Sequence, residues 1–245
     1  MAAVAALKLR AVTFDFGWTL AELDTVMLAG RLAEIGAVAG GAAEIEALAG
    51  RLDAGGADAV RAYSVAIKAG HGGHPWKLLM THLLSGAGVA AEQVARAVDF
   101  LWDQQPTRNL WRRPVPGMIE LVQELRGLGV PVGVISNSEG HLAELARELG
   151  WLQLFDAFAD SGKLGMEKPG REIFEWTAER LGVQVQEMVH VGDAWAADVE
   201  GALGAGAHAV WFGGDAEATL PERVRVCRDA AAVRRVLVGW GVIEG

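Results

Sequence analysis

Asp15, Ser136 and Asp193 are the residues of this chain most clearly placed to do chemistry. Each follows, directly or after one glycine, a short run of apolar, mostly β-favouring residues. Such runs predict parallel strands buried on both faces. An ionised Asp is costly to bury unless another group pairs with it. Asp15 could simply cap a turn. Whether it is instead a functional carboxylate depends on whether later segments supply partners for it.

The three strand ends are expected to meet. In an open parallel sheet, ligands bind outside the carboxyl ends of the strands. Asp15 and Asp193 would then be like charges in close proximity, which is unfavourable unless a cation lies between them. Mg²⁺ is the natural candidate, because it prefers oxygen ligands.

Two further charged residues could belong to the same site. Asp198, five residues after Asp193, is either an additional acidic group of the site or a first-turn carboxylate that complements a helix dipole. Lys168 precedes Pro169 at the start of a predicted helix. It is either a charge partner for the carboxylates and a phosphate, or a solvated surface lysine.

The elements that must position these residues alternate between strand and helix. Predicted strands at 130–135, 157–159, 188–191 and 207–212 are separated by amphipathic helices, which indicates a parallel sheet with right-handed crossovers. Residues 22–106 show helical periodicity only and predict a small bundle, with a helix break near Gly55-Gly56. The expected fold is therefore α/β, with a Rossmann-like core from residues 1–21 and 107–245 and an inserted helical domain.

Composition excludes several classes of protein. Of 245 residues, 51% are hydrophobic and 22% are charged, which predicts a folded chain, and the net charge of −9 argues against nucleic-acid binding. Cys227 is the only cysteine, which fits a reducing compartment. The apolar run in Met1–Arg10 is too short for a signal sequence, and no stretch reaches the roughly 20 apolar residues of a bilayer span. We expect a cytoplasmic protein without a membrane partner; the oligomeric state is not indicated.

Four segments together carry a resemblance to a known family. They are Asp15–Thr19, Ser136-Asn137, Lys168-Pro169 and Gly192–Asp198, in that order, with the helical insertion after the first. Over essentially its whole length the chain resembles the haloacid dehalogenase-like (HAD) hydrolases with an α-helical cap of the first type. Each motif is weak alone, but four in order at strand ends or adjoining loops are specific.

The resemblance implies a phosphatase site that acts on a small phosphorylated molecule. Asp15 would be the nucleophile and form an aspartyl-phosphate. Asp15, the carbonyl of Gly17 and Asp193 would bind Mg²⁺, with Asp198 beside or behind them.

The remaining motif residues would bind the phosphate. Ser136 would donate to the transferred phosphoryl group, and backbone N–H groups near Phe16 and Asn137 would assist. Lys168 would neutralise charge on the nucleophile and the phosphate. Catalysis of this kind is mainly positioning and charge stabilisation.

Gly17 departs from the family pattern. Phosphatases of the family carry a second Asp two residues after the nucleophile, where it protonates the leaving group and activates water. Glycine can do neither, and general acid–base catalysis is typically worth 10²–10⁴-fold. Turnover could therefore be low. Two alternatives stay open: a dehalogenase-type hydrolase, although the Tyr usual there is absent, or a non-enzymatic member that binds a phosphorylated ligand or partner.

Several other residues are weaker candidates. His71 and His74 flank two glycines in the insertion and could replace the missing acid, but an exposed turn is the simpler interpretation. His190 lies inside an apolar run and is interpreted as a core residue with its polar atoms satisfied. Trp18 and Trp195 follow the first and fourth motifs and could either line a pocket or pack loops.

Overall fold

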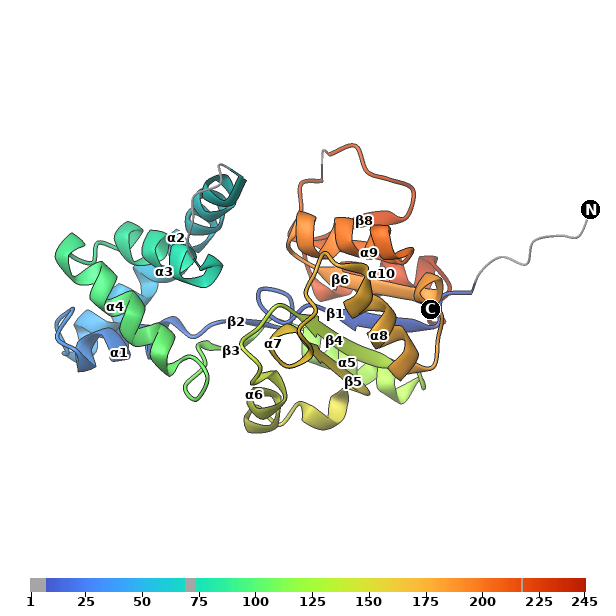
Figure 1. Ribbon diagram of the computed structural model, residues 1–245, viewed down its shortest axis with the longest axis horizontal. Helices are drawn as coiled ribbons and strands as arrows, with labels where there is room; N and C mark the ends of the chain where they lie inside the picture. Colours follow the sequence, from blue (N-terminus) through green and yellow to red (C-terminus); the bar gives the residue numbers. More distant parts are fainter. Residues whose placement is uncertain (1–7, 69–73, 217) are drawn as a thin grey trace, which may run out of the picture. The chain divides into compact units, whose positions relative to one another are not determined.

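A six-stranded parallel sheet forms the framework of the larger part of the chain (Figure 1). The computed structural model describes residues 8–68, 74–216 and 218–245. The strand order is β5-β4-β1-β6-β7-β8. The strands are β1 (Ala11–Phe14), β4 (Val132–Ser136), β5 (Ala157–Asp160), β6 (Met188–Gly192), β7 (His208–Phe212) and β8 (Val224–Cys227).

Burial explains why these segments are strands. Every residue of β1, β4 and β6 is buried, as expected for central parallel strands covered on both faces. β1 pairs with β4 on one side and with β6 on the other, so that the carboxyl ends of three strands lie together. This arrangement confirms the α/β, Rossmann-like fold predicted from the sequence.

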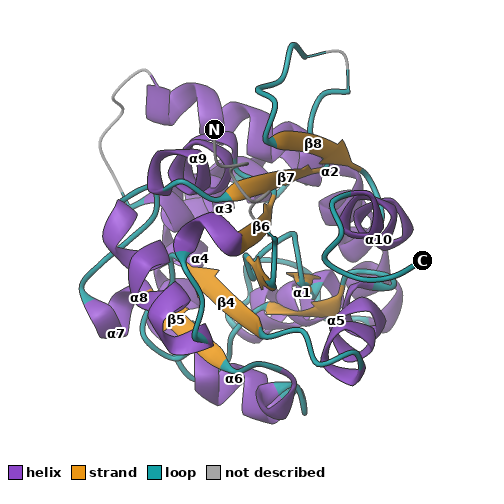
Figure 2. Cartoon of the chain, turned by 90° about the vertical axis from the view of Figure 1, so that its right-hand side faces the viewer, coloured by secondary structure: helices purple, strands orange, loops and turns teal. Residues whose placement is uncertain are grey.

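Helices cover both faces of the sheet. Figure 2 shows α8 (Arg171–Leu181) and α9 (Gly201–Ala205) on one face, and α5 (Met118–Gly127) and α10 (Ala230–Gly239) on the other. α8 and α9 contribute Phe174, Ala178 and Ala202 to a core cluster beneath the sheet. The shorter helical elements are α6 (Leu142–Glu148), α7 (Ser161–Leu164), η1 (Leu152–Leu154), η2 (Val185–Glu187) and the π-helical η3 (Trp195–Glu200).

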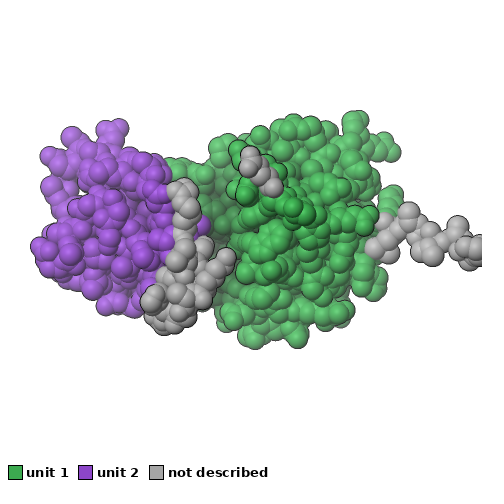
Figure 3. All heavy atoms as spheres, turned by 90° about the horizontal axis from the view of Figure 1, so that it is seen from above, with its two compact units in different colours: residues 1–22, 112–245 green, residues 23–111 purple. Residues whose placement is uncertain are grey.

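The chain divides into two compact units, coloured separately in Figure 3. Unit 1 comprises Met1–Glu22 and Arg112–Gly245, and unit 2 comprises Leu23–Trp111. The sequence predicted an insertion over residues 22–106, and its role as a cap stays a proposal. The short strands β2 (Ala21–Leu23) and β3 (Trp111–Pro114) form a separate two-stranded sheet at the unit boundaries.

Unit 2 contains four helices among its described residues: α1 (Thr25–Glu34), α2 (Ala42–Lys68), α3 (Pro75–Gly86) and α4 (Ala91–Gln104). Asp24 caps α1 by accepting a hydrogen bond from the Met27 N–H at 2.8 Å. The predicted break at Gly55-Gly56 is wrong, since α2 is continuous there. Buried residues on both sides, Leu52 and Ala59, anchor the helix and outweigh the cost of about 1 kcal/mol per glycine.

The sequence patterns did not predict three of the short strands. β2, β3 and β8 have three or four residues each and every one of them contains a charged residue, so no apolar run marks them in the sequence. Each helix in the part of the chain that the structure describes is too short or too polar to span a bilayer.

Candidate active site

Asp15 stands at the end of β1, where the strand order places it between the ends of β4 and β6. Its backbone N–H donates to the Val191 carbonyl at 2.8 Å, which ties the residue to the end of β6. Asp15 is buried. A carboxylate buried at this position requires a partner.

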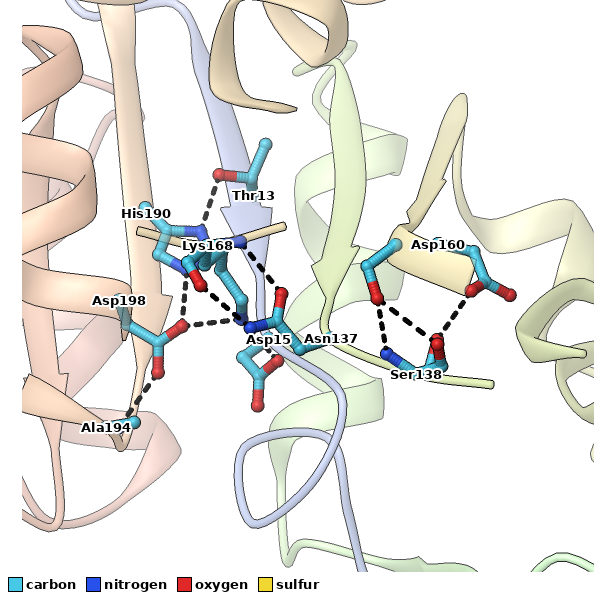
Figure 4. A network of polar contacts seen from close by, with 10 residues as sticks. Thr13, Asp15, Asn137, Ser138, Asp160, Lys168, His190, Ala194 and Asp198 are labelled. Atoms are coloured by element: carbon cyan, nitrogen blue, oxygen red, sulfur yellow. Dashed lines mark hydrogen bonds and ion pairs between the residues drawn. The ribbon is translucent and has the colours of Figure 1, made fainter. Parts of the chain in front are cut away.

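The partner of Asp15 is Lys168. The Lys168 Nζ lies 2.5 Å from Asp15 Oδ1 and 2.6 Å from Asp198 Oδ1 (Figure 4). Lys168 is only 4% exposed, so it is not a solvated surface lysine. Burial by itself lowers the pKa of Lys168, but the two carboxylates outweigh that effect and hold the pKa above its ordinary value. The ammonium group therefore stays charged at neutral pH.

The Asn137 side chain fixes the backbone of Lys168. Its Oδ1 accepts from the Lys168 N–H at 2.8 Å, and its Nδ2 donates to the Lys168 carbonyl at 2.9 Å (Figure 4). The two bonds engage both the backbone N–H and the backbone carbonyl of Lys168. Asn137 follows Ser136, the buried last residue of β4. Ser136 therefore lies at the carboxyl end of the strand beside β1.

Asp198 comes to the site from η3. Its Oδ1 contacts Lys168, and its Oδ2 accepts from the Ala194 N–H at 2.8 Å. Burial raises the pKa of Asp198, but Lys168 and His190 outweigh it, so the pKa lies below its ordinary value. A Cβ on Gly192 would overlap the Asp198 carboxyl group, so this close approach requires a glycine. π-Helical turns are rare in proteins, and those that occur are frequently found at functional sites.

Asp193 completes an acidic cluster. One carboxylate oxygen each from Asp15, Asp193 and Asp198 lies within 4.8 Å of the others. Burial, followed by the charges of Asp198 and Asp15, raises the pKa of Asp193 well above its ordinary value. Three clustered carboxylates beside one ammonium group leave excess negative charge. A divalent cation with oxygen ligands fits this donor set.

The residues that follow Asp15 form a tight loop. Phe16 is buried, with its ring centroid 6.0 Å from that of Trp151, and Gly17 forms an isolated bridge with Ala21. Trp18 adopts a left-handed φ of 52°, which is uncommon for a residue other than glycine. Backbone strain of this kind concentrates near functional sites.

Two of the weaker candidates, His74 and Trp195, pack against other aromatic side chains. The His74 ring packs on Trp102 in unit 2 at 4.1 Å, and His71 lies outside the described residues. Trp195 packs against Trp211 at 4.7 Å, and the Trp211 indole N–H donates to the Asp193 carbonyl at 2.9 Å.

Two residues with clear structural connections to the site were missed or undervalued. Asp160, the last residue of β5, is 2% exposed and organises the loop after Ser136. It accepts from Ser138 Oγ and from the backbone N–H groups of Gly140, Leu142 and Gly162 at 2.8–3.1 Å. His190 is buried, as the sequence interpretation expected of a core residue, and its imidazole also contacts Asp198. The available signal was a polar residue in an otherwise apolar strand, at its end for Asp160 and in its interior for His190.

Comparison with known proteins places the chain in a family. A family model for haloacid dehalogenase-like hydrolases matches residues 9–206. A glyceraldehyde 3-phosphate phosphatase of Methanopyrus kandleri is 34% identical over 123 residues, covering 49% of this chain and 51% of that protein. The pyrimidine 5'-nucleotidase YjjG of Escherichia coli is 31% identical over 101 residues, covering 40% and 44%.

A solved structure shows the same fold along most of the chain. The HAD-hydrolase YfnB from Bacillus subtilis, bound to magnesium, superposes with a TM-score of 0.65 at 20% identity and covers 94% of this chain and 99% of that one. By contrast, the chain spans about half the length of the curated phosphatase relatives given above. Because the family model covers most of the sequence, the chain belongs to the haloacid dehalogenase-like hydrolases.

Proposed function

We propose that the protein is a Mg²⁺-dependent phosphatase that acts on a small phosphorylated molecule through Asp15. The observation that carries the proposal is the buried contact of Lys168 with both Asp15 and Asp198, beside Asp193. An ammonium group and a carboxylate cluster beside the carboxyl ends of adjacent strands suit phosphoryl transfer, where charge stabilisation dominates. The named relatives include two phosphatases of small phosphorylated compounds.

The metal would be held by the acidic cluster. Asp15, Asp193 and the Gly17 carbonyl are the proposed ligands, with Asp198 beside them. When bound, Mg²⁺ would offset the negative charge of the carboxylates and the phosphate.

The reaction would proceed in two displacements. A carboxylate oxygen of Asp15 attacks phosphorus, the bond from phosphorus to the ester oxygen breaks, and the leaving group departs with the electron pair. Water then attacks phosphorus of the aspartyl-phosphate, which releases inorganic phosphate and regenerates Asp15. Ser136 and the backbone N–H groups near Phe16 and Asn137 would orient the phosphoryl oxygens, while Lys168 neutralises charge.

Release of phosphate tests the proposal directly. The protein should hydrolyse aryl and acyl phosphates with Mg²⁺ and lose that activity with EDTA. Asp15→Asn removes the nucleophile and should reduce turnover by more than about 10³-fold. Release of halide from a 2-haloacid without metal would replace the proposal with dehalogenation. Absence of both activities, with retained binding of a phosphate mimic, would indicate a non-enzymatic member.

Gly17 predicts a preference for good leaving groups. Aryl and acyl phosphates need little protonation of the leaving oxygen, whereas alkyl phosphates need an acid. We expect Gly17→Asp to raise turnover of alkyl phosphates, by up to about 10²–10⁴-fold, and to change aryl phosphate turnover much less. Gly17→Asn is the matched control, because it has the same size and no acid. Equal rates for the two variants on alkyl phosphates would contradict the prediction.

A further inference from the structure

His190 places an imidazole in the middle of the sheet. It lies on β6, is 0% exposed, and is aligned with Thr13 on β1. The imidazole packs edge-on against Phe174 at 5.3 Å between ring centroids. A buried polar ring at this position is costly unless both nitrogens are hydrogen-bonded.

Both nitrogens are in fact bonded, and the chemistry of the partners fixes their roles. Nε2 lies 3.1 Å from Asp198 Oδ1, and a carboxylate can only accept, so Nε2 carries the proton (Figure 4). Nδ1 lies 3.0 Å from the Thr13 hydroxyl, which donates to it. The Val189 carbonyl is a more distant alternative acceptor for that hydroxyl, at 3.4 Å.

These bonds connect the sheet interior to the nucleophile. The order is Thr13, His190, Asp198, Lys168 and Asp15, with successive contacts of 3.0, 3.1, 2.6 and 2.5 Å. Each of the five residues is buried. Lys168 carries its charge on a flexible four-carbon stem, so the carboxylates around it decide where its ammonium group rests.

We propose that His190, oriented by Thr13, is a positioning residue that fixes the Asp198 carboxylate and thereby holds the Lys168 ammonium group on Asp15. Asp198 is otherwise anchored at its Oδ2 by the Ala194 N–H. Without the His190 bond, rotation of the carboxylate would carry Oδ1, and Lys168 with it, away from Asp15. The role in turnover rests on the phosphatase function proposed above.

A pair of substitutions at His190 separates positioning from simple packing. Glutamine can present an N–H near the place of Nε2, whereas leucine fills the space without a donor. We expect His190→Leu to lower kcat for an aryl phosphate by about 10–100-fold with KM changed less than about threefold, the range typical of hydrogen-bond partners that orient the ligands of a metal site. His190→Gln should restore kcat to within about fivefold of the wild type.

Equal kcat values for the leucine and glutamine variants, both folded by circular dichroism, would overturn the proposal. If His190→Leu does not fold, the decisive comparison is His190→Gln with Thr13→Val, which removes only the hydroxyl. Thr13→Val should lower kcat by a few-fold at unchanged KM, and an unchanged kcat in that variant would count against the proposal.

A second readout does not depend on turnover or on metal. In the metal-free protein, imidazole ¹⁵N NMR should show His190, assigned by its loss in His190→Gln, as the Nε2–H tautomer. Asp198→Asn should shift the Nε2 resonance, and Thr13→Val should shift Nδ1. An Nδ1–H tautomer, or no response to Asp198→Asn, would overturn the positioning role. Absence of phosphate release by the wild type alongside the expected spectra would overturn only the proposed phosphatase function.

Discussion

At the scale of single residues, the site combines one ammonium group with three carboxylates. Lys168 contacts Asp15 and Asp198 directly, whereas no described ion pair joins Asp193 to a cation. Burial and the neighbouring carboxylates raise the pKa of Asp193, which expresses the cost of holding a third negative charge there. The cluster therefore should gain stability either from a bound cation or from loss of one charge.

Replacing Asp193 should make the metal-free protein more stable and the metal ineffective. Asp193→Asn removes one like charge, so its thermal unfolding midpoint without divalent cations should rise by a few degrees. Mg²⁺ should then raise the midpoint of the wild type but not of the variant. Mg²⁺ at 100 times its Kd would stabilise the folded wild type by about 2.7 kcal/mol, because it binds the folded state only. Thermal unfolding by fluorimetry with and without MgCl₂ measures both effects.

Asp103→Asn serves as the charge-matched control, because Asp103 is exposed in unit 2. It should leave the Mg²⁺ response intact. A wild-type midpoint that does not respond to Mg²⁺ would remove the support for a metal site.

Cys227 provides a pH-dependent contribution to stability. Burial, with a smaller effect of Asp229, raises the pKa of the thiol from 9.0 to about 11. The folded state therefore favours the neutral thiol. Its contribution is complete below about pH 9 and is lost as the pH rises through about 11. The urea midpoint of the wild type should fall more steeply between pH 9 and 11 than that of Cys227→Ala. Parallel pH profiles would contradict this expectation.

At the scale of elements, the site depends on how closely helices approach loops. A Cβ on Gly201, the first residue of α9, would lie 3.0 Å from both Phe174 and the Pro169 backbone. Pro169 adjoins Lys168, so α9 supports the segment that carries the ammonium group. A Cβ on Gly204 in the same helix meets no atom within 4 Å.

The two α9 glycines should therefore respond in opposite directions. Gly201→Ala is expected to lower the free energy of unfolding by about 1–3 kcal/mol through overpacking. Gly204→Ala should raise it by about 0.5–1 kcal/mol, because alanine favours the helix and has space. Urea denaturation of both variants tests the pair. The same sign of effect in both would show that packing of α9 against the Lys168 segment is not the cause.

At the scale of the whole molecule, each unit has its own apolar core. Unit 2 buries large side chains that include Leu28, Leu32, Leu52, Met80, Leu84 and Leu101. Its ends are joined by a hydrogen bond from the Asp24 N–H to the Leu110 carbonyl at 2.8 Å. A segment with a core and adjacent ends has the properties of an independently folding domain.

Residues 23–111 produced alone should therefore fold. We expect a helical circular dichroism spectrum and a cooperative urea transition from this segment, without phosphatase activity. A random-coil spectrum, or a helical spectrum that melts without cooperativity, would show that unit 2 needs unit 1 to fold.

The sequence by itself determined the parallel α/β core and the family, because apolar periodicity and motif order are local properties of the chain, and it predicted a helical insertion over residues 22–106. It also identified Asp15, Lys168, Asp193 and Asp198 as candidate site residues. It failed at Gly55-Gly56, where packing on both sides of the glycines outweighs local helix propensity. It also could not distinguish a buried charge partner from a surface lysine at position 168.

Only the tertiary structure decided which of these residues meet. The order of strands brings Thr13 and His190 into register across 177 residues of chain, and it brings Lys168 within hydrogen-bond distance of Asp15 across 153. Such contacts depend on the order of the strands in the sheet and on the packing of segments that are far apart in the chain, which no local pattern encodes. The pKa of each ionisable group at this site depends on its burial and on the neighbouring charges. Both arise only when distant segments fold together.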